Sequence, residues 1–177
     1  LYHVDSMIRD RGRVPQVNAP KTWKTKGINI MAKSHIIVLG NEKGGTGKST
    51  VSMHLIASLT RMGYPVGSID VDARQGTLTR YIENRKATSD KMDKPLPQST
   101  HVPLLLSTNS IKEEAVKEDQ ANLEAAIAKL SSNAFILIDT PGSDSSLSRA
   151  AHAMADTLIT PLNDSFIDLD MLVRLKG

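Results

Sequence analysis

Residues 40–50 read Gly40-Asn41-Glu42-Lys43-Gly44-Gly45-Thr46-Gly47-Lys48-Ser49-Thr50 and join a short apolar run to an amphipathic segment. The run, residues 35–39, is typical of a buried parallel strand. Residues 48–62 place apolar side chains three and four positions apart, and Gly63 follows as a helix stop. A glycine-rich turn between a strand and a helix is the context that a phosphate-binding loop requires. The stretch therefore predicts a nucleotide-binding α/β fold.

The residue types of this loop suit a bound triphosphate. Glycines let backbone N–H groups approach phosphate oxygens without a Cβ clash, and the following helix presents its positive end to the anion. We predict that Lys48 contacts the β- and γ-phosphates, that the Ser49 hydroxyl binds Mg²⁺ and that Thr50 bonds a phosphate nearer the nucleoside. The predicted nucleotide-binding residues of the loop are Lys43, Gly44, Gly45, Thr46, Gly47, Lys48, Ser49 and Thr50. A glycine-rich turn carrying surface lysines is the plain alternative, which seven specified positions disfavour.

The rest of the chain alternates between strand and helix patterns. Further strands are predicted at 66–70, 135–139 and 157–161, and residues 104–106 are a candidate short strand. Helices are predicted from residue 76 or 77, and from about residue 110 to residue 130, with a surface loop over 87–103. This order indicates a doubly wound, mostly parallel sheet with helices on both faces.

Three aspartates follow predicted strands. Asp70 and Asp72 come after the second strand, and Asp139 ends a later strand directly before Thr140-Pro141-Gly142. The carboxyl ends of parallel strands converge on the crevice where ligands bind. One aspartate at a strand end is often only a turn or cap residue, but three in order after a phosphate loop favour a metal site.

The charge is unevenly distributed. The chain has 177 residues and a net charge of +3, yet residues 1–33 alone hold seven Lys or Arg and two Asp. We interpret residues 1–33 as a basic disordered arm or a non-native leader, with Met31 as the natural start. We expect residues 34–177 to be an ATPase domain that is incomplete at its C-terminus, because the chain stops within a helical pattern begun near Asp168.

Composition excludes several classes of site. The chain has no cysteine, which rules out disulfides, thiolate zinc sites and cysteine-held iron–sulfur clusters. It also has no run of about 20 apolar residues, so we expect no transmembrane segment.

The loop resembles that of one particular ATPase family. Glu42 breaks the usual G-x-x-x-x-G-K-[ST] template, but K-G-G-x-G-K-[ST] fits from Lys43 to Ser49. This pattern is similar to the deviant Walker A loop of the family that includes ParA partition ATPases, MinD and nitrogenase iron protein. The resemblance implies that Lys43 reaches across a homodimer to the partner's phosphates, and that Lys43, Lys48 and Asp72 are catalytic.

The same resemblance implies roles for the remaining site residues. Asp70 would help to hold Mg²⁺ through water, Asp72 would orient the attacking water, and Asp139 looks like the Walker B acid, also acting through water. Together with Ser49 these carboxylates would hold the metal. Gly142 resembles the switch glycine whose N–H senses the γ-phosphate.

Several strings resemble the MipZ branch of this family more closely than the ParA branch. They include Asp70-Val71-Asp72-Ala73-Arg74-Gln75, Glu83-Asn84-Arg85, residues 135–142 and Asn163-Asp164-Ser165-Phe166. The resemblance implies a cytoplasmic, nucleoid-associated switch that uses ATP and Mg²⁺, and dimerises on binding ATP. It would interact with a ParB-like protein, bind DNA non-specifically through a C-terminal surface, and position the division site by inhibiting FtsZ assembly.

Three alternatives remain open. A ParA-type chromosome or plasmid partition ATPase would share the chemistry, and the Ala73-Arg74-Gln75 string argues against it. A metabolic enzyme of the iron–sulfur reductase kind would need bridging cysteines, and a small-molecule kinase would need an acceptor site that the sequence does not reveal. A fragment that binds nucleotide without turnover is the non-enzymatic alternative.

Overall fold

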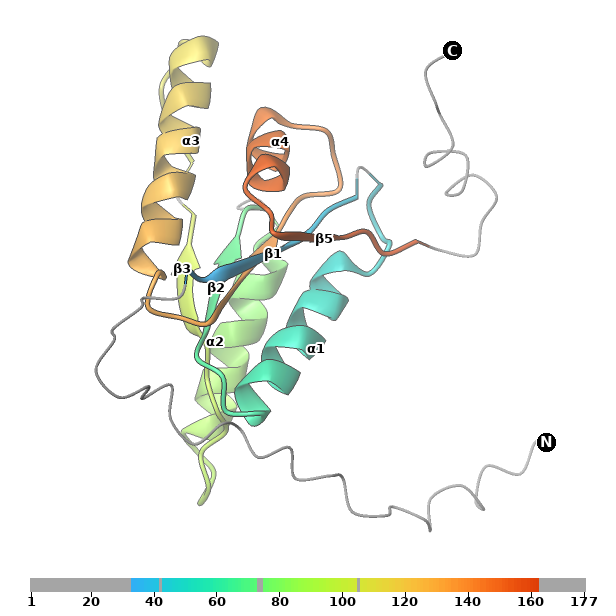
Figure 1. Cartoon of the computed structure of the whole chain (residues 1–177), viewed down its shortest axis with the longest axis vertical. Coiled ribbons are helices and arrows are strands. Elements are labelled where there is room, and N and C mark those ends of the chain that lie inside the picture. The colour runs from blue at the N-terminus through green and yellow to red at the C-terminus, as the bar shows by residue number, and fades with distance from the viewer. Residues whose placement is uncertain (1–32, 42, 73–74, 105, 163–177) are drawn as a thin grey trace, which may run out of the picture. The chain divides into compact units, whose positions relative to one another are not determined.

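The computed structural model describes residues 33–41, 43–72, 75–104 and 106–162 of the chain (Figure 1). These residues all belong to one compact unit. The predictions made for residues 1–32, Glu42, Ala73-Arg74 and 163–177 lie outside the described residues. In the described part, the elements are β1 His35–Leu39, α1 Lys48–Arg61, β2 Val66–Asp70, α2 Thr77–Ser89, β3 Thr100–Pro103, α3 Lys112–Lys129, β4 Phe135–Asp139, α4 Ser146–Ala153 and β5 Thr157–Ile159.

The strands form one sheet in the order β3-β2-β4-β1-β5, and all four pairings are parallel. The predicted parallel α/β fold is therefore confirmed. In β4 the last residue, Asp139, pairs with Leu39 of β1 on one side and with Asp70 of β2 on the other. The carboxyl ends of these three central strands are consequently level with one another.

Helices cover both faces of the sheet. Figure 1 shows α3 and α4 on one side of the strands, and α1 and α2 on the other. Alternate residues of β1 accordingly enter different clusters: Ile36 and Val38 pack with α3 and α4, whereas Ile37 and Leu39 pack with α1 and α2. Strands buried on both faces often contain long apolar runs, as β1 and β4 do, and β1, β2 and β4 have the predicted limits.

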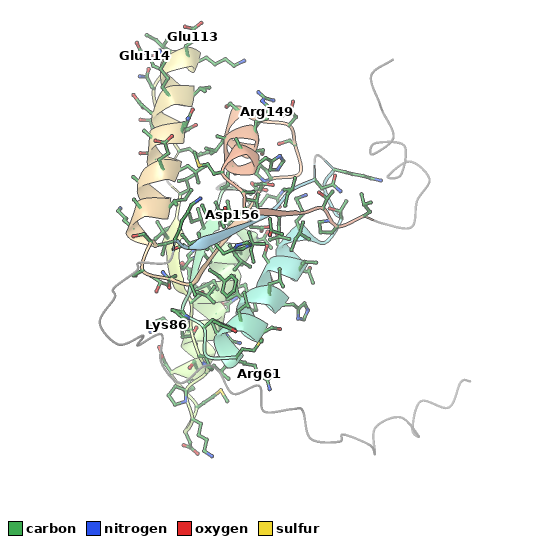
Figure 2. All side chains as sticks on the ribbon, in the orientation of Figure 1. Arg61, Lys86, Glu113, Glu114, Arg149 and Asp156 are labelled. Carbon is green, nitrogen blue, oxygen red and sulfur yellow. The ribbon has the colours of Figure 1, made fainter. Side chains whose placement is uncertain are left out.

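Charged residues at the helix ends suit the helix dipoles. Figure 2 labels Glu113 and Glu114 in the first turn of α3, and Arg61 and Lys86 in the last turns of α1 and α2. Carboxylates near a helix N-terminus and cations near a C-terminus are both stabilising. In contrast, the first turn of α1 holds no acidic residue and no side chain caps its N-terminus. The positive end of α1 is thus left for another anion.

Three predicted boundaries were wrong at the edges of the fold. The third strand is Thr100–Pro103, with Leu104 and Leu106 outside it, and α2 continues to Ser89 into the predicted loop. β3 is an edge strand that pairs only with β2 and is partly exposed, so it lacks the apolar run of a central strand. β5, another edge strand, ends at Ile159 and not at residue 161.

The apolar residue directly before α3 lies outside the core. Ile111 precedes the helix as its N-cap and is 55% exposed, whereas Leu123 is fully buried. Across the described residues, none of the helices is both long and apolar enough to cross a membrane.

These exposures predict different losses of stability when the side chains of Ile111, before α3, and Leu123, within α3, are truncated. Leu123→Ala should lower the free energy of unfolding by about 2–5 kcal/mol, because it leaves a cavity under the helix. Ile111→Ala should change it by no more than about 0.5 kcal/mol, because its side chain is already in solvent. Urea unfolding of both variants measures the difference. If both variants lost the same free energy of unfolding, Leu123 would not be the buried residue and Ile111 the exposed one.

Candidate active site

A cavity of about 730 Å³ lies at the carboxyl end of the sheet. This volume is in the range of small-molecule and cofactor sites. Three segments form much of its wall: the glycine-rich loop and start of α1 (residues 44–50), the segment after β2 (Val71, Asp72 and Gln75), and the segment after β4 (residues 140–143). The other lining residues are Thr77, Leu106, Asp119 and residues 145–147. Every predicted loop residue from Gly44 to Thr50 therefore lines one cavity, together with Asp72 and Gly142.

The loop has the backbone conformation that its glycines predict. Gly45 and Gly47 have φ angles of 77° and 87°, in the left-handed region that other residues rarely adopt. Asn41 anchors the start of the loop: its amide donates to the Pro161 carbonyl at 2.8 Å, and its side-chain oxygen accepts from the Lys43 N–H at 2.9 Å. The loop is thereby fixed to the chain that follows β5.

Lys48 is buried within the loop and is 7% exposed. Its ammonium group donates to the Lys43 carbonyl at 3.0 Å. Burial lowers the pKa of Lys48, while the charges of Asp139 and Asp72 oppose that shift. A desolvated cation with a carbonyl partner gains from an incoming anion, and phosphate is the anion that this loop geometry suits.

Asp139 lies at the end of β4 and is almost fully buried. Its carboxylate accepts a hydrogen bond from the Ser52 hydroxyl at 3.0 Å and another from the Ser49 side chain. Burial raises the pKa of Asp139 to about 6, although these two hydrogen bonds and Lys48 lower it. Ser49 and Asp139 together present the hard oxygen donors that Mg²⁺ prefers. The residues present thus fit a magnesium site.

Asp70 and Asp72 have different surroundings. Asp70 is 2% exposed, and its carboxylate accepts from the Thr79 N–H at 2.9 Å, the Thr79 hydroxyl at 3.1 Å and the Asp72 N–H at 3.1 Å. Asp72 lines the cavity, and its carboxylate accepts from the Gln75 N–H at 3.2 Å. Asp72 therefore faces the ligand space directly, while Asp70 lies beneath it next to Asp139 in the strand register.

In the described part of the chain, the site does not hold enough carboxylates to bind a metal ion by themselves. Among the described residues, no three acidic or histidine side chains are grouped closely enough to hold an ion. Mg²⁺ commonly binds through one or two carboxylates together with substrate phosphates and water. The arrangement of Ser49 and Asp139 beside the phosphate loop matches that mode.

Gly142 packs against the phosphate loop. A Cβ at this position would lie 2.6 Å from the Cα of Gly44 and 2.7 Å from its amide nitrogen, so no larger residue fits without displacing the backbone. Just before it, the Thr140 hydroxyl donates to the Leu39 carbonyl at 2.7 Å. The segment after β4 is therefore fixed at one end to β1 and touches the loop at the other.

Sequence reasoning missed Ser52, Thr79 and Thr140. Ser52 lies one helical turn after Ser49, on the buried side of α1, and a polar residue on an apolar helix face is the signal that could have found it. Thr79 and Thr140 contact their partners only through the tertiary fold, and their local sequence gives no comparable signal.

The chain was also compared with known proteins. A family model described as "ATPase MipZ" matches residues 35–177. The chromosome partitioning protein ParA of Myxococcus xanthus is 26% identical over 187 residues, which cover 93% of this chain and 62% of that protein. The chain spans between 17% and 62% of the length of eight curated relatives.

Solved structures share the fold. A putative plasmid partition protein from Borrelia burgdorferi, bound to AMPPNP, has a TM-score of 0.59 at 20% identity, over 80% of this chain and 68% of that one. The septum site-determining protein MinD from Pyrococcus horikoshii, complexed with Mg-ADP, has a TM-score of 0.55 at 23% identity, over 77% and 61% of the two chains.

The raised pKa of Asp139 predicts a pH-dependent stability of the nucleotide-free protein. Between the unfolded pKa of about 4 and the folded pKa of about 6, the native state binds more protons, so stability falls as pH rises through this window. Above it, the ionised carboxylate costs up to about 3 kcal/mol. Asp139→Asn should therefore stabilise the protein more at about pH 7.5 than at about pH 4.5 in urea unfolding.

Asp156→Asn serves as the control of opposite sign. The Ile36 N–H donates to Asp156 at 2.8 Å and lowers the pKa of that carboxyl, which Figure 2 labels. Its charge contributes stability above the unfolded pKa, so removing it should destabilise the protein at neutral pH. A destabilising effect of Asp139→Asn at neutral pH would contradict the burial argument.

Proposed function

The chain belongs to the MipZ family of ATPases, and we propose that it binds and hydrolyses ATP with Mg²⁺ as a switch that dimerises. The observation that supports this best is that three features lie in one cavity or directly beside it. They are the buried cation Lys48, the Ser49–Asp139 oxygen pair and the cavity-facing carboxylate of Asp72. A phosphate site, a metal site and a water-orienting acid are the parts that phosphoryl transfer to water needs.

The phosphates would be held by the loop and by α1. Backbone N–H groups of residues 44–47 and the uncapped start of α1 offer hydrogen bonds and a positive dipole end. Lys48 would bind the β- and γ-phosphates, and Thr50, which also lines the cavity, would bind a phosphate nearer the nucleoside. The relatives bound to AMPPNP and Mg-ADP support the same ligand class for this chain.

The metal and the water would be held at the ends of β2 and β4. Ser49 and Asp139 would hold Mg²⁺, with Asp139 and Asp70 acting through water. Bound Mg²⁺ would neutralise charge on the phosphate oxygens. Asp72 would accept a hydrogen bond from the attacking water and orient it, and the N–H of Gly142 would donate to the γ-phosphate. Catalysis of this kind depends mainly on positioning and electrostatics.

Lys43 would act in a homodimer. It stands at the start of the loop, half-buried, and its backbone carbonyl accepts the hydrogen bond of Lys48. In an ATP-bound pair of protomers, its ammonium group would contact the partner's phosphates and stabilise the charge that develops during transfer, as an arginine finger does. Hydrolysis would then remove the contact and return the protein to the monomer.

The cellular role that we propose is control of the division site. As a MipZ family member, the ATP-bound dimer would bind DNA non-specifically, interact with a ParB-like protein at chromosome origins and inhibit FtsZ assembly, in the cytoplasm on the nucleoid. The long match to a chromosome partitioning ParA makes a partition ATPase the second candidate. Sedimentation of FtsZ polymers separates the two: the MipZ role requires that this protein with ATP reduces the polymer pellet, and an unchanged pellet favours partition.

Substitutions in the loop and after β2 should separate binding from turnover. Lys48→Ala should abolish ATP binding, because the phosphates lose their buried cation. Asp72→Ala should keep ATP binding within about threefold and lower kcat at least about a hundredfold, because only water orientation is lost. Fluorescent nucleotide titration and a phosphate-release assay measure the two quantities. If Asp72→Ala hydrolyses ATP as fast as the wild type, Asp72 has no role in the mechanism. If the wild type itself binds ATP without hydrolysing it, the protein is a nucleotide-binding protein and not an ATPase.

The dimer contact predicts a concentration effect. Hydrolysis per protomer should rise with protein concentration in the wild type and stay low and flat in Lys43→Ala, because the partner's lysine completes the site. Lys112→Ala, on the solvent-exposed start of α3, is the matched loss of one lysine and should behave as the wild type does. A Lys43→Ala profile that overlays the wild type at every concentration counts against a lysine acting across the dimer.

A further inference from the structure

A line of polar side chains runs from the edge strand β3 to the candidate metal site. The Ser68 hydroxyl lies 3.0 Å from Nδ1 of His101, and Nε2 of His101 lies 3.1 Å from the Thr79 hydroxyl. The Thr79 hydroxyl in turn lies 3.1 Å from Oδ2 of Asp70. Strands β2 and β3 and helix α2 thus meet in one hydrogen-bonded chain that ends on a buried carboxylate.

If the imidazole of His101 is neutral, the protons of this hydrogen-bond network can be assigned in one way. An ionised carboxylate only accepts, so the Thr79 hydroxyl must donate to Asp70 and accept from His101. Nε2 of His101 therefore carries the proton, and Nδ1 accepts from the Ser68 hydroxyl. Burial lowers the pKa of His101, although the charges of Asp70 and Glu83 and a hydrogen bond with the Ser68 backbone raise it. The net lowering favours the neutral ring.

Both oxygens of Asp70 are held in this way. Oδ2 also accepts from the Thr79 N–H at 2.9 Å, an amide in the first turn of α2. No side chain caps α2 at Gly76, so Asp70 satisfies one of the amides that a helix start leaves unpaired. Oδ1 accepts from the Asp72 N–H at 3.1 Å. The orientation of Asp70 and the backbone position of Asp72 therefore depend on the same network.

We propose that Thr79 and His101 are positioning residues that hold the 70–72 segment in the geometry needed for hydrolysis of MgATP. This inference rests on the proposed function. Neither residue is among those that line the cavity, so each would act through Asp70 and Asp72. A network that served only to stabilise α2 would affect unfolding without a specific effect on turnover.

Substitutions at position 79 test the proposal in the full chain. Thr79→Val keeps the shape and the backbone N–H but removes the hydroxyl, and Thr79→Ser restores it. We expect Thr79→Val to lower kcat about tenfold, the size of one lost hydrogen bond to a charged group, and Thr79→Ser to stay within about twofold of the wild type. ATP affinity measured with EDTA should be unchanged in both, whereas ATP affinity with Mg²⁺ should fall in Thr79→Val.

Thr60→Val is the matched control. Its hydroxyl donates to the Ile56 carbonyl at 2.7 Å in the last turns of α1, and the residue is buried, whereas Thr79 is partly buried. The substitution replaces a hydroxyl by a methyl group at both positions, but Thr60 is away from the cavity. Thr60→Val should therefore lower the stability of the protein and leave kcat unchanged. If Thr79→Val and Thr60→Val lose similar stability and both keep the wild-type kcat, the positioning role is overturned. A wild type that neither binds nor hydrolyses MgATP instead defeats the proposed function, and the inference with it.

The ring of His101 gives a second readout that needs no nucleotide. ¹⁵N NMR of the free protein near neutral pH should show the Nε2–H tautomer of His101, and Thr79→Val should shift its Nε2 signal. His101→Gln, whose amide can still donate to Thr79, should retain more turnover than His101→Leu. This pair of variants tests the proposal even if Thr79→Val does not fold. An Nδ1–H tautomer, a cationic ring, or equal turnover of the two His101 variants would overturn the proposal.

Discussion

The site depends on the position of β4 between β1 and β2. Because all three strands are parallel and in register, Leu39, Asp139 and Asp70 end at the same level of the sheet. The loop that leaves β1 and the segments that follow β2 and β4 are therefore brought to one cavity, and Asp139 lies beside it, hydrogen-bonded to Ser49. A register slip of one residue in β4 would turn Asp139 to the other face and separate it from Ser49 and Ser52.

Burial of charge destabilises the free protein and would be compensated by ligands of opposite charge. Lys48, Asp70 and Asp139 are each less than a tenth exposed, and two of them show pKa shifts that burial dominates. Such groups destabilise the empty fold and are compensated when an anion and a cation arrive together. A ligand that binds only the native state adds stability by mass action, so occupancy and folding should be linked in this protein.

Sequence patterns predicted the centre of the fold well and its edges poorly. β1 and β4 were found with their observed limits because strands covered on both faces hold long apolar runs. β2 was found as well, although its buried sequence Val-Gly-Ser-Ile-Asp is only partly apolar. β3 was misplaced because an edge strand with Ser and His contacts carries no such pattern. In the site, the loop could be predicted because its geometry is local. Thr79 could not, because its partner Asp70 is nine residues away and the strand and helix must both be in place.

The contact of Gly142 with Gly44 is between backbones, with no side chain in either half. Most packing contacts can be adjusted by replacing one side chain with a slightly larger or smaller one, but this close approach of two backbone segments cannot. Any displacement of the loop at residue 44 must move residue 142 or open a gap, and α4 begins only four residues further on. A movement of the phosphate loop at Gly44 would therefore press on the segment that leads into α4, because position 142 leaves no room even for a Cβ.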